Sequence, residues 1–181
     1  EWIAYNRLIG VTDFLIYTND CTDGTDRLLE ELSASGIVTH LPNPAEPGGR
    51  YQMAALKAAA HHDLVRQADW IYVCDVDEFM DIRIGEGSIT DLVTVCGNPQ
   101  AISVTMRMMA NGGVSSYEDR PIIEQFTRTH DAELWGDQKA IEVKTLTRTD
   151  FPLRNFGAHR PFVNTSFDFE NETLDWTNGS G

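Results

Sequence analysis

The run Trp70-Ile71-Tyr72-Val73-Cys74-Asp75-Val76-Asp77-Glu78-Phe79 organises the whole chain. Its first five residues form the most apolar strand-like segment of the sequence, which predicts a buried strand. Two aspartates separated by one residue follow at once. Because ligands of open α/β sheets bind outside the carboxyl ends of the strands, this order of residues predicts a ligand site directly after the strand.

Strand and helix patterns alternate upstream of this run. Apolar segments at 14–17 and 37–41 predict two strands, and helical periodicity covers 1–9, 25–35 and 50–67. Strands that alternate with helices of this length indicate a mixed, mostly parallel sheet flanked by helices. The fold class predicted from these patterns is therefore α/β.

The alternation weakens downstream of Phe79. We predict a short helix at 88–96 with Ser88 as its N-cap and a strand at 101–109. Further strands at 118–123 and 138–146 are expected to pair in an antiparallel or mixed way. A single domain at 1–164 and a polar surface tail at 165–181 account for the chain. The first residue is Glu1 inside a helical pattern, so we expect an N-terminal piece to be missing.

The composition excludes several classes of protein. Acidic residues outnumber basic ones 28 to 14, and no basic cluster occurs, which disfavours binding to nucleic acid or to an anionic membrane surface. No apolar run approaches the roughly 18 residues that predict a transmembrane helix. The three cysteines fit neither a zinc site nor a disulfide framework, and this favours a reducing, cytoplasmic location.

Asp75 and Asp77 are the candidate metal ligands. Residues two apart in an extended segment point the same way, so both carboxylates can face one site while Val76 packs behind them. Two carboxylates at close range repel each other unless a cation intervenes, and their hard oxygen atoms suit Mg²⁺ or Mn²⁺. Such an ion would stabilise the charge on a departing diphosphate. The alternative is a solvated acidic turn at the end of a strand.

A second acidic loop, Asn19-Asp20-Cys21-Thr22-Asp23-Gly24-Thr25, also follows a predicted strand and opens a helix. Asp20 could accept hydrogen bonds from a nucleoside, and Asp23 is a further candidate for this contact. The alternative is that Asp23 or Thr22 caps the helix. Both interpretations hold together if Asp23 or Thr22 caps while Asp20 faces the ligand.

These motifs together resemble bacterial glycosyltransferases of the family 2-like group, and the DVDEF element resembles glycosyltransferase family 92. The resemblance covers residues 1–83 and continues more loosely into a later motif. It rests on Glu1 to Val11, Asn19 to Thr25, Ala68-Asp69-Trp70, Asp75 to Phe79 and Gly157-Ala158-His159-Arg160-Pro161.

The resemblance implies a GT-A-type fold, a nucleotide-sugar donor, a carbohydrate acceptor and a divalent metal. Asp75 and Asp77 would hold the metal and the diphosphate, Asp20 would contact the nucleoside, and His159 would complete the metal shell. The family's opening strand, which normally precedes the first helix, has no counterpart here. Candidates for phosphate contact are Arg50, Gln52, Lys139 and Arg160.

The catalytic base is sought among carboxylates, because an inverting transfer needs one near the acceptor hydroxyl. Asp137 is the first candidate and Glu133 the second, in a loop beside Trp135, which could stack on a sugar ring. Glu78 is a further possibility, with a salt bridge as its alternative role.

Two other functions compete with the transferase. A haloacid-dehalogenase-like phosphohydrolase would use Asp75 as its nucleophile and Asp77 as its acid/base. Against it, Phe79 stands where that motif has Thr or Val, and two strand–helix units precede the motif. The second competitor is a non-catalytic carbohydrate-binding domain with the same fold.

Overall fold

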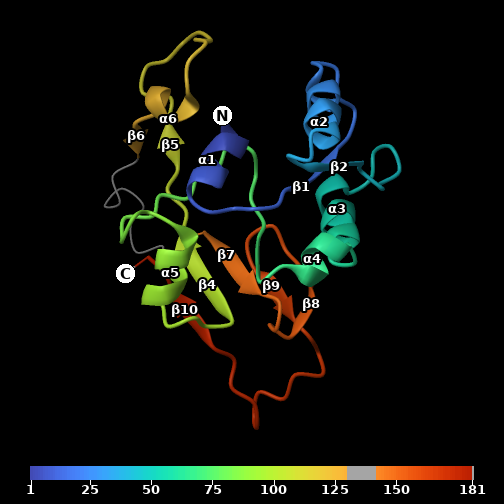
Figure 1. The fold of residues 1–181 in the computed structure, drawn as a ribbon, viewed down its shortest axis with the longest axis vertical. Helices are drawn as coiled ribbons and strands as arrows, with labels where there is room; N and C mark the ends of the chain where they lie inside the picture. The colour runs from blue at the N-terminus through green and yellow to red at the C-terminus, as the bar shows by residue number, and fades with distance from the viewer. Residues whose placement is uncertain (130–141, 181) are drawn as a thin grey trace.

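A computed structural model describes residues 1–129 and 142–180, and its ribbon is shown in Figure 1. The helices are α1 (Trp2–Leu8), α2 (Thr25–Ala34), α3 (Tyr51–Ala59), α4 (Asp63–Gln67), α5 (Ile89–Val95) and α6 (Ile122–Gln125). The first strands are β1 (Leu15–Thr18), β2 (Thr39–Pro42), β3 (Trp70–Tyr72), β4 (Ala101–Thr105) and β5 (Met109–Ala110). The later strands are β6 (Arg128–Thr129), β7 (Val143–Arg148), β8 (Leu153–Phe156), β9 (Pro161–Val163) and β10 (Trp176–Asn178).

The predicted α/β class is confirmed, but the prediction of a mostly parallel sheet is wrong. The largest sheet has four strands in the order β10-β4-β7-β3, and β7 runs antiparallel to both of its neighbours. Parallel pairing occurs between β10 and β4 and in the separate two-stranded sheet of β1 and β2. The prediction failed because periodicity reports whether a strand is buried, whereas its direction depends on partners far along the chain.

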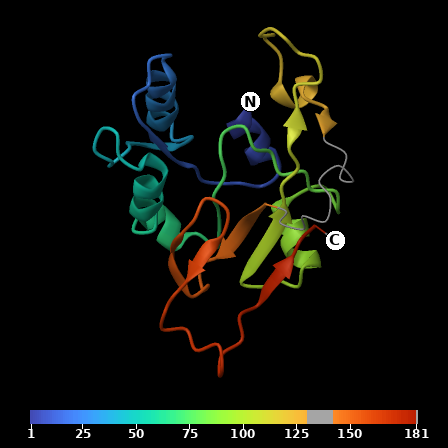
Figure 2. The ribbon, with the colours of Figure 1, turned by 180° about the vertical axis from the view of Figure 1, so that it is seen from behind.

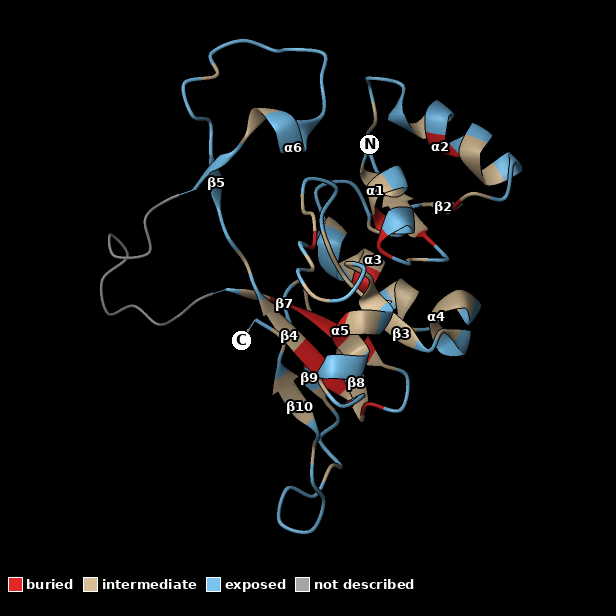
Figure 3. Ribbon diagram, turned by 60° about the vertical axis from the view of Figure 1, so that its left-hand side comes forward, coloured by how far each residue is buried: buried red, intermediate tan, exposed pale blue. Residues whose placement is uncertain are grey.

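The main core lies on one face of the four-stranded sheet. Ile102 on β4 and Leu146 on β7 are fully buried and pack with Ile9, Met80 and Leu92. Figure 3 shows how the buried residues concentrate on these two central strands. Burial of such large aliphatic side chains contributes about 1.5–3 kcal/mol each. The core therefore joins α1, α5 and the segment after β3 to the sheet.

A smaller core supports the first acidic loop. Phe14, Leu29 and Val38 are buried together between β1, α2 and β2. The strands and the helix predicted here are present with boundaries shifted by one or two residues. Local periodicity was sufficient because each of these elements packs against its immediate neighbour in sequence.

Three predicted elements differ in the structure. The strand predicted at 101–109 is divided into β4 and β5. The helix predicted at 50–67 is divided into α3 and α4, because His62 has an extended backbone and its ring nitrogen accepts the Leu64 N–H as an N-cap. The strand predicted at 118–123 is instead the turn and short helix α6. Its first free N–H groups, at Ile122 and Ile123, donate to the Glu1 carboxylate.

Two further segments frame the sheet. Residues 106–129, which include β5, α6 and β6, form an arm that stands apart from α2 and α3, with α1 between them (Figures 1 and 2). The polar segment from 165 onward was expected to remain at the surface, yet its residues 176–178 form β10 at the edge of the main sheet. None of the helices in the described ranges has the length and apolar character that a membrane crossing requires.

Candidate functional site

The DVDEF element forms a tight turn beyond the end of β3. The strand ends at Tyr72, Val73 and Cys74 continue the chain, and the Glu78 N–H then donates to the Asp75 carbonyl at 3.1 Å. The alternation assumed for Asp75 and Asp77 is therefore wrong, since Asp77 lies at the corner of a turn. Val76 is 67% exposed and does not pack behind the aspartates.

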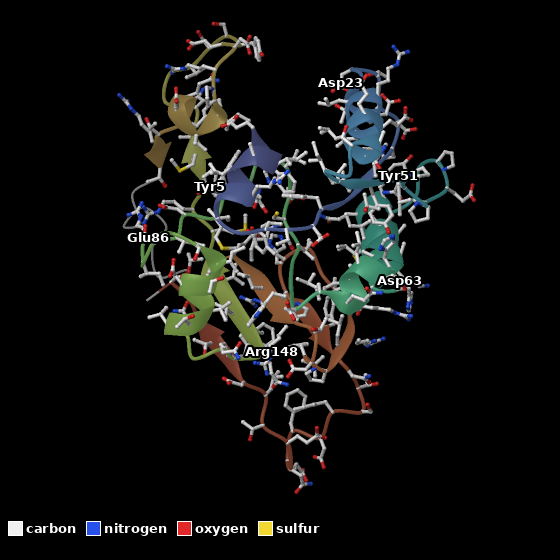
Figure 4. The ribbon with its side chains drawn as sticks, viewed as in Figure 1. Tyr5, Asp23, Tyr51, Asp63, Glu86 and Arg148 are labelled. Carbon is white, nitrogen blue, oxygen red and sulfur yellow. The ribbon has the colours of Figure 1, made fainter. Side chains whose placement is uncertain are left out.

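Contacts from α1 hold this turn in place. The Trp2 indole N–H donates to the Glu78 carbonyl at 3.0 Å, and the Tyr5 hydroxyl donates to the Met80 carbonyl at 2.9 Å. The Tyr5 ring also packs edge-to-face on Phe79, with 5.1 Å between ring centroids. Figure 4 marks Tyr5 on α1 beside this region. A helix from the start of the chain thus fixes a turn more than seventy residues later.

Lys144 on β7 lies against the motif and was not identified from the sequence. Its ammonium Nζ is 2.9 Å from Glu78 Oε2 and 3.3 Å from Asp75 Oδ2, and its side chain is only 3% exposed. Glu78 Oε2 also accepts the Asp75 backbone N–H at 3.0 Å. One buried cation therefore holds both acidic side chains and closes the turn.

The sequence contained a signal for Lys144. Residues two apart on a strand share a face, so Lys144 lies on the same face of β7 as Leu146, which is part of the core. A lysine on an apolar face needs an acidic partner, because an unpaired buried charge is very costly. That pattern predicts a buried ion pair, although it cannot say which carboxylate provides it.

The charges of the cluster change the ionisation of its members. Burial alone lowers the pKa of Lys144, but the hydrogen bond and charge of Glu78, together with Asp75, raise it above its ordinary value of 10.5. Burial and the charge of Glu78 raise the pKa of Cys74 to about 12. At neutral pH the lysine is therefore charged and the Cys74 thiol is protonated, which makes this thiol a poor nucleophile or metal ligand.

The two carboxylates of the predicted metal site differ in their surroundings. The Asp75 side chain is 55% exposed, and its second oxygen, Oδ1, has no hydrogen bond within the described residues. Asp77 is exposed, and its side chain makes no hydrogen bond or ion pair within the described ranges. Glu78 is 18% exposed and already paired with Lys144. The salt-bridge role considered for Glu78 is confirmed, and Asp75 and Asp77 are left as the accessible pair.

His159 lies in the tight hairpin between β8 and β9. The Gly157 N–H donates to the Arg160 carbonyl at 3.0 Å, and a side chain at Gly157 would collide with that carbonyl and with the Phe162 ring. The His159 carbonyl accepts the Thr145 hydroxyl at 3.0 Å, and its ring nitrogen Nδ1 is 3.3 Å from the Val143 carbonyl. His159 thus contacts the strand that carries Lys144, and within the described residues it forms no hydrogen bond or ion pair with Asp75 or Asp77.

The first acidic loop makes only local contacts. The Asp23 carboxylate accepts the Thr25 N–H at 3.0 Å at the start of α2, and this bond lowers the pKa of Asp23. Asp23 thus satisfies the first free N–H of α2, while Gly24 occupies the N-cap position itself. Asp20 is exposed and has a left-handed backbone with φ of 53°. Its contact with a nucleoside remains a prediction. Figure 4 shows Asp23 at the outer end of α2, well separated from Tyr5.

The other predicted site residues are scattered. Gln52 is exposed near the start of α3, and Arg160 is exposed beside His159. The catalytic candidates Asp137 and Glu133, together with Lys139, lie outside the described residues. Their roles remain predictions.

Asp75 and Asp77 are suitable ligands for a divalent cation that binds together with a phosphate-containing substrate. Within the described ranges, no group of three or more His, Cys, Asp or Glu side chains is arranged to hold a metal ion. Mg²⁺, however, is commonly held by one or two carboxylates plus phosphate oxygens and water. Asp75 Oδ1 and Asp77 supply hard oxygen atoms of this type, so the donor set is suitable but incomplete without a substrate.

Comparison with known proteins identifies the family. The family model for glycosyltransferase family 92 matches residues 1–165, which covers the motif turn, Lys144 and the His159 hairpin. A search of curated proteins finds no match to this chain. The match extends over most of the sequence and confirms the resemblance inferred from the DVDEF element, so this chain belongs to glycosyltransferase family 92.

Proposed function

We propose that this protein is a metal-dependent glycosyltransferase that moves a sugar from a nucleotide-diphosphate sugar to an acceptor hydroxyl. Membership of the family makes it a glycosyltransferase, and the donor and metal are inferred from the motif turn. The observation that carries the proposal is the exposed Asp75 carboxylate, held on one side by a buried lysine with its other oxygen available. A haloacid-dehalogenase-like phosphohydrolase is disfavoured by the family match.

The chain's own residues would act as follows. Asp75 and Asp77 would hold Mn²⁺ or Mg²⁺, which when bound supplies positive charge that stabilises the leaving diphosphate. Lys144 and Glu78 keep Asp75 in position, and fixed charges of this kind need little reorganisation during the reaction. His159 is proposed as an additional metal ligand, because its hairpin contacts the strand of Lys144.

The remaining assignments concern donor and acceptor. Asp20 and Gln52 are proposed to contact the nucleotide, while Asp23 acts chiefly as a helix cap. Asp137, or else Glu133, is proposed to accept the proton of the acceptor hydroxyl. A carboxylate that acts as a general base on such a hydroxyl typically raises the reaction rate by about 10²–10⁴-fold.

The test is an assay of donor turnover. The protein is incubated with a panel of nucleotide-diphosphate sugars in Mn²⁺, in Mg²⁺ and in EDTA, and release of the nucleoside diphosphate is measured. We expect turnover of at least one donor with metal, and its loss in EDTA. In parallel, p-nitrophenyl phosphate is offered as a phosphomonoester substrate.

Matched variants make the assay specific. Asp77→Asn should remove metal-dependent turnover, whereas Asp63→Asn, an exposed aspartate at the start of α4, should retain it. Cleavage of p-nitrophenyl phosphate without donor turnover would support the phosphohydrolase instead. Donor binding without any turnover would support the carbohydrate-binding alternative.

A further inference from the structure

Lys144 removes much of the negative charge that the motif could offer to a metal. The motif contains three carboxylates, at Asp75, Asp77 and Glu78, and the Lys144 ammonium contacts two of them. The cluster as a whole is left with two negative charges. A dication approaching Asp75 meets both a carboxylate that is already paired and a positive charge next to it.

Lys144 cannot easily move away to admit a cation. Its side chain is 3% exposed on a central strand of the sheet, and the neighbouring Leu146 and Ile102 are fully buried in the core. Displacement of the ammonium would leave the largely buried Glu78 carboxylate without its cation, which is strongly unfavourable. The metal must therefore bind in the presence of the lysine's charge.

A nucleoside diphosphate changes this balance. Its phosphate oxygens supply ligands that the described side chains lack, and their negative charge offsets the repulsion between the lysine and the dication. The same arrangement that disfavours binding of the cation alone is compatible with binding of the cation and diphosphate together.

We infer that Lys144 is an internal counter-ion of the Asp75–Glu78 turn, which keeps the affinity of the free protein for divalent metal low and couples metal binding to the donor diphosphate. This inference rests on the proposed function, because it concerns the same metal site. It assigns to Lys144 a role in positioning and in the order of binding, through Asp75, rather than contact with the substrate.

A purely structural role for Lys144 makes a different prediction. If the lysine only holds the turn together, its removal and the removal of Glu78 should both weaken metal binding. If it acts as a counter-ion, the two changes have opposite effects, because one removes a positive charge from the site and the other removes a negative charge.

The experiment is a titration with Mn²⁺ followed by electron paramagnetic resonance, in which the sharp signal of free Mn²⁺ disappears on binding. Wild type, Lys144→Met, Lys144→Arg and Glu78→Gln are titrated with Mn²⁺ alone and then with UDP, GDP or ADP present. Lys57→Met, which alters an exposed lysine on α3, is the control for loss of a positive charge elsewhere. Circular dichroism confirms that each variant is folded.

We expect Lys144→Met to bind Mn²⁺ alone roughly tenfold more tightly than wild type, the size of the repulsion between a dication and an ammonium a few ångströms apart in a water-like medium. Lys144→Arg should retain wild-type affinity, and Glu78→Gln should bind more weakly. A nucleoside diphosphate should tighten Mn²⁺ binding more in wild type than in Lys144→Met. Equal or weaker binding by folded Lys144→Met would overturn the inference.

A second variant covers the case in which Lys144→Met does not fold. The double variant Lys144→Met/Glu78→Gln removes both charges of the buried pair, and it should bind Mn²⁺ more tightly than Glu78→Gln alone. Equal affinity of these two proteins would contradict the inference. Donor turnover in wild type with unchanged Mn²⁺ affinity in these variants would refute only the role of Lys144. Tighter Mn²⁺ binding with no donor turnover would instead refute only the transferase proposal.

Discussion

The chain has two acidic loops that look alike in sequence and differ in structure. Both the Asn19–Thr25 loop and the Asp75–Glu78 turn follow a strand and carry aspartates. The hydrogen bonds of the first loop's side chains reach no further than two residues along the chain. The second is tied to Lys144, which is 69 residues away, and to α1 at the start of the chain.

Local hydrogen bonds, as in the Asn19–Thr25 loop, stabilise the end of a helix, whereas long-range contacts, as in the Asp75–Glu78 turn, fix a side chain relative to the core. A carboxylate that bonds its neighbours stabilises a local backbone end, as Asp23 does for α2. A carboxylate held by a buried charge from a distant strand is fixed with respect to the whole core, as Asp75 is. Catalytic groups must be held in this second way, because small displacements reduce rates strongly.

The largest expected effect on stability comes from the buried lysine. Lys144→Met leaves Glu78 without its cation and should cost about 3–5 kcal/mol of unfolding free energy, as measured for broken buried ion pairs. Urea denaturation followed by circular dichroism checks this. Lys57→Met, at an exposed site, should change stability by less than about 0.5 kcal/mol. Similar losses in both variants would mean that Lys144 does not tether the turn.

The same tether has a defined dependence on pH. The pKa of Lys144 is higher in the folded protein than its ordinary value of 10.5, so protonation favours the folded state. The contribution of the protonated lysine to the free energy of unfolding should be complete below about pH 10 and should disappear as the pH rises further. The stability difference between wild type and Lys144→Met should therefore shrink in strongly alkaline solution.

The next effect compares the aspartates of the two loops in the donor assay. Asp75→Asn should reduce metal-dependent turnover by about a hundredfold or more, since loss of a metal's charge stabilisation is worth several kcal/mol. Asp20→Asn should raise KM roughly tenfold with little change in kcat, because it removes one hydrogen bond to the bound nucleoside. Equal effects of the two changes would remove the distinction between the loops.

A smaller effect tests the contact from α1. Tyr5→Phe deletes the hydroxyl that donates to the Met80 carbonyl and should cost about 1 kcal/mol, the usual contribution of one such hydrogen bond. Tyr117→Phe is the matched control, because that ring is 89% exposed and its hydroxyl donates to Asp119, two residues away. Thermal unfolding of both variants is the measurement, and a stability loss confined to Tyr117→Phe would contradict the tether.

The smallest effect concerns the local cap. The Thr25 N–H holds the pKa of Asp23 below its ordinary value of 3.8, so the charged carboxylate stabilises the folded protein. This contribution is present above that value and is lost as the pH falls below it. Asp23→Ala should lower the melting temperature slightly at pH 7, and Asp23→Asn should not, since Asn also caps helices. If Asp23→Ala lowered the melting temperature equally at pH 2 and pH 7, the charged Asp23 carboxylate would not be the source of the stabilisation.

Prediction from sequence succeeded where neighbouring elements pack on each other. The elements from α1 to β2 were recognised because their apolar faces meet within the first 42 residues. The antiparallel or mixed pairing expected for the strand at 138–146 is confirmed in β7. Prediction failed for α6, whose N–H groups are satisfied by the distant Glu1 carboxylate. There a partner far along the chain decided between conformations that the local pattern leaves equally possible.

The candidate site shows the same limit. The family match includes the DVDEF element, whose role as a site remains a prediction. The direction of its side chains was derived from an extended strand, which the structure does not have there. The carbonyl of Asp75 accepts the Glu78 N–H, and the resulting turn breaks the alternation. A turn of this kind depends on its supports, which here are Trp2, Tyr5 and Lys144.

The sequence by itself determined the α/β class, the order of the first elements and the acidic motif after the third strand, because periodicity and local spacing are properties of the covalent chain. Only the tertiary structure decided that Lys144 pairs with Asp75 and Glu78 while Asp77 stays exposed. The physical reason is that a buried charge selects its partner through the packing of strands, and that packing joins residues which no local pattern relates.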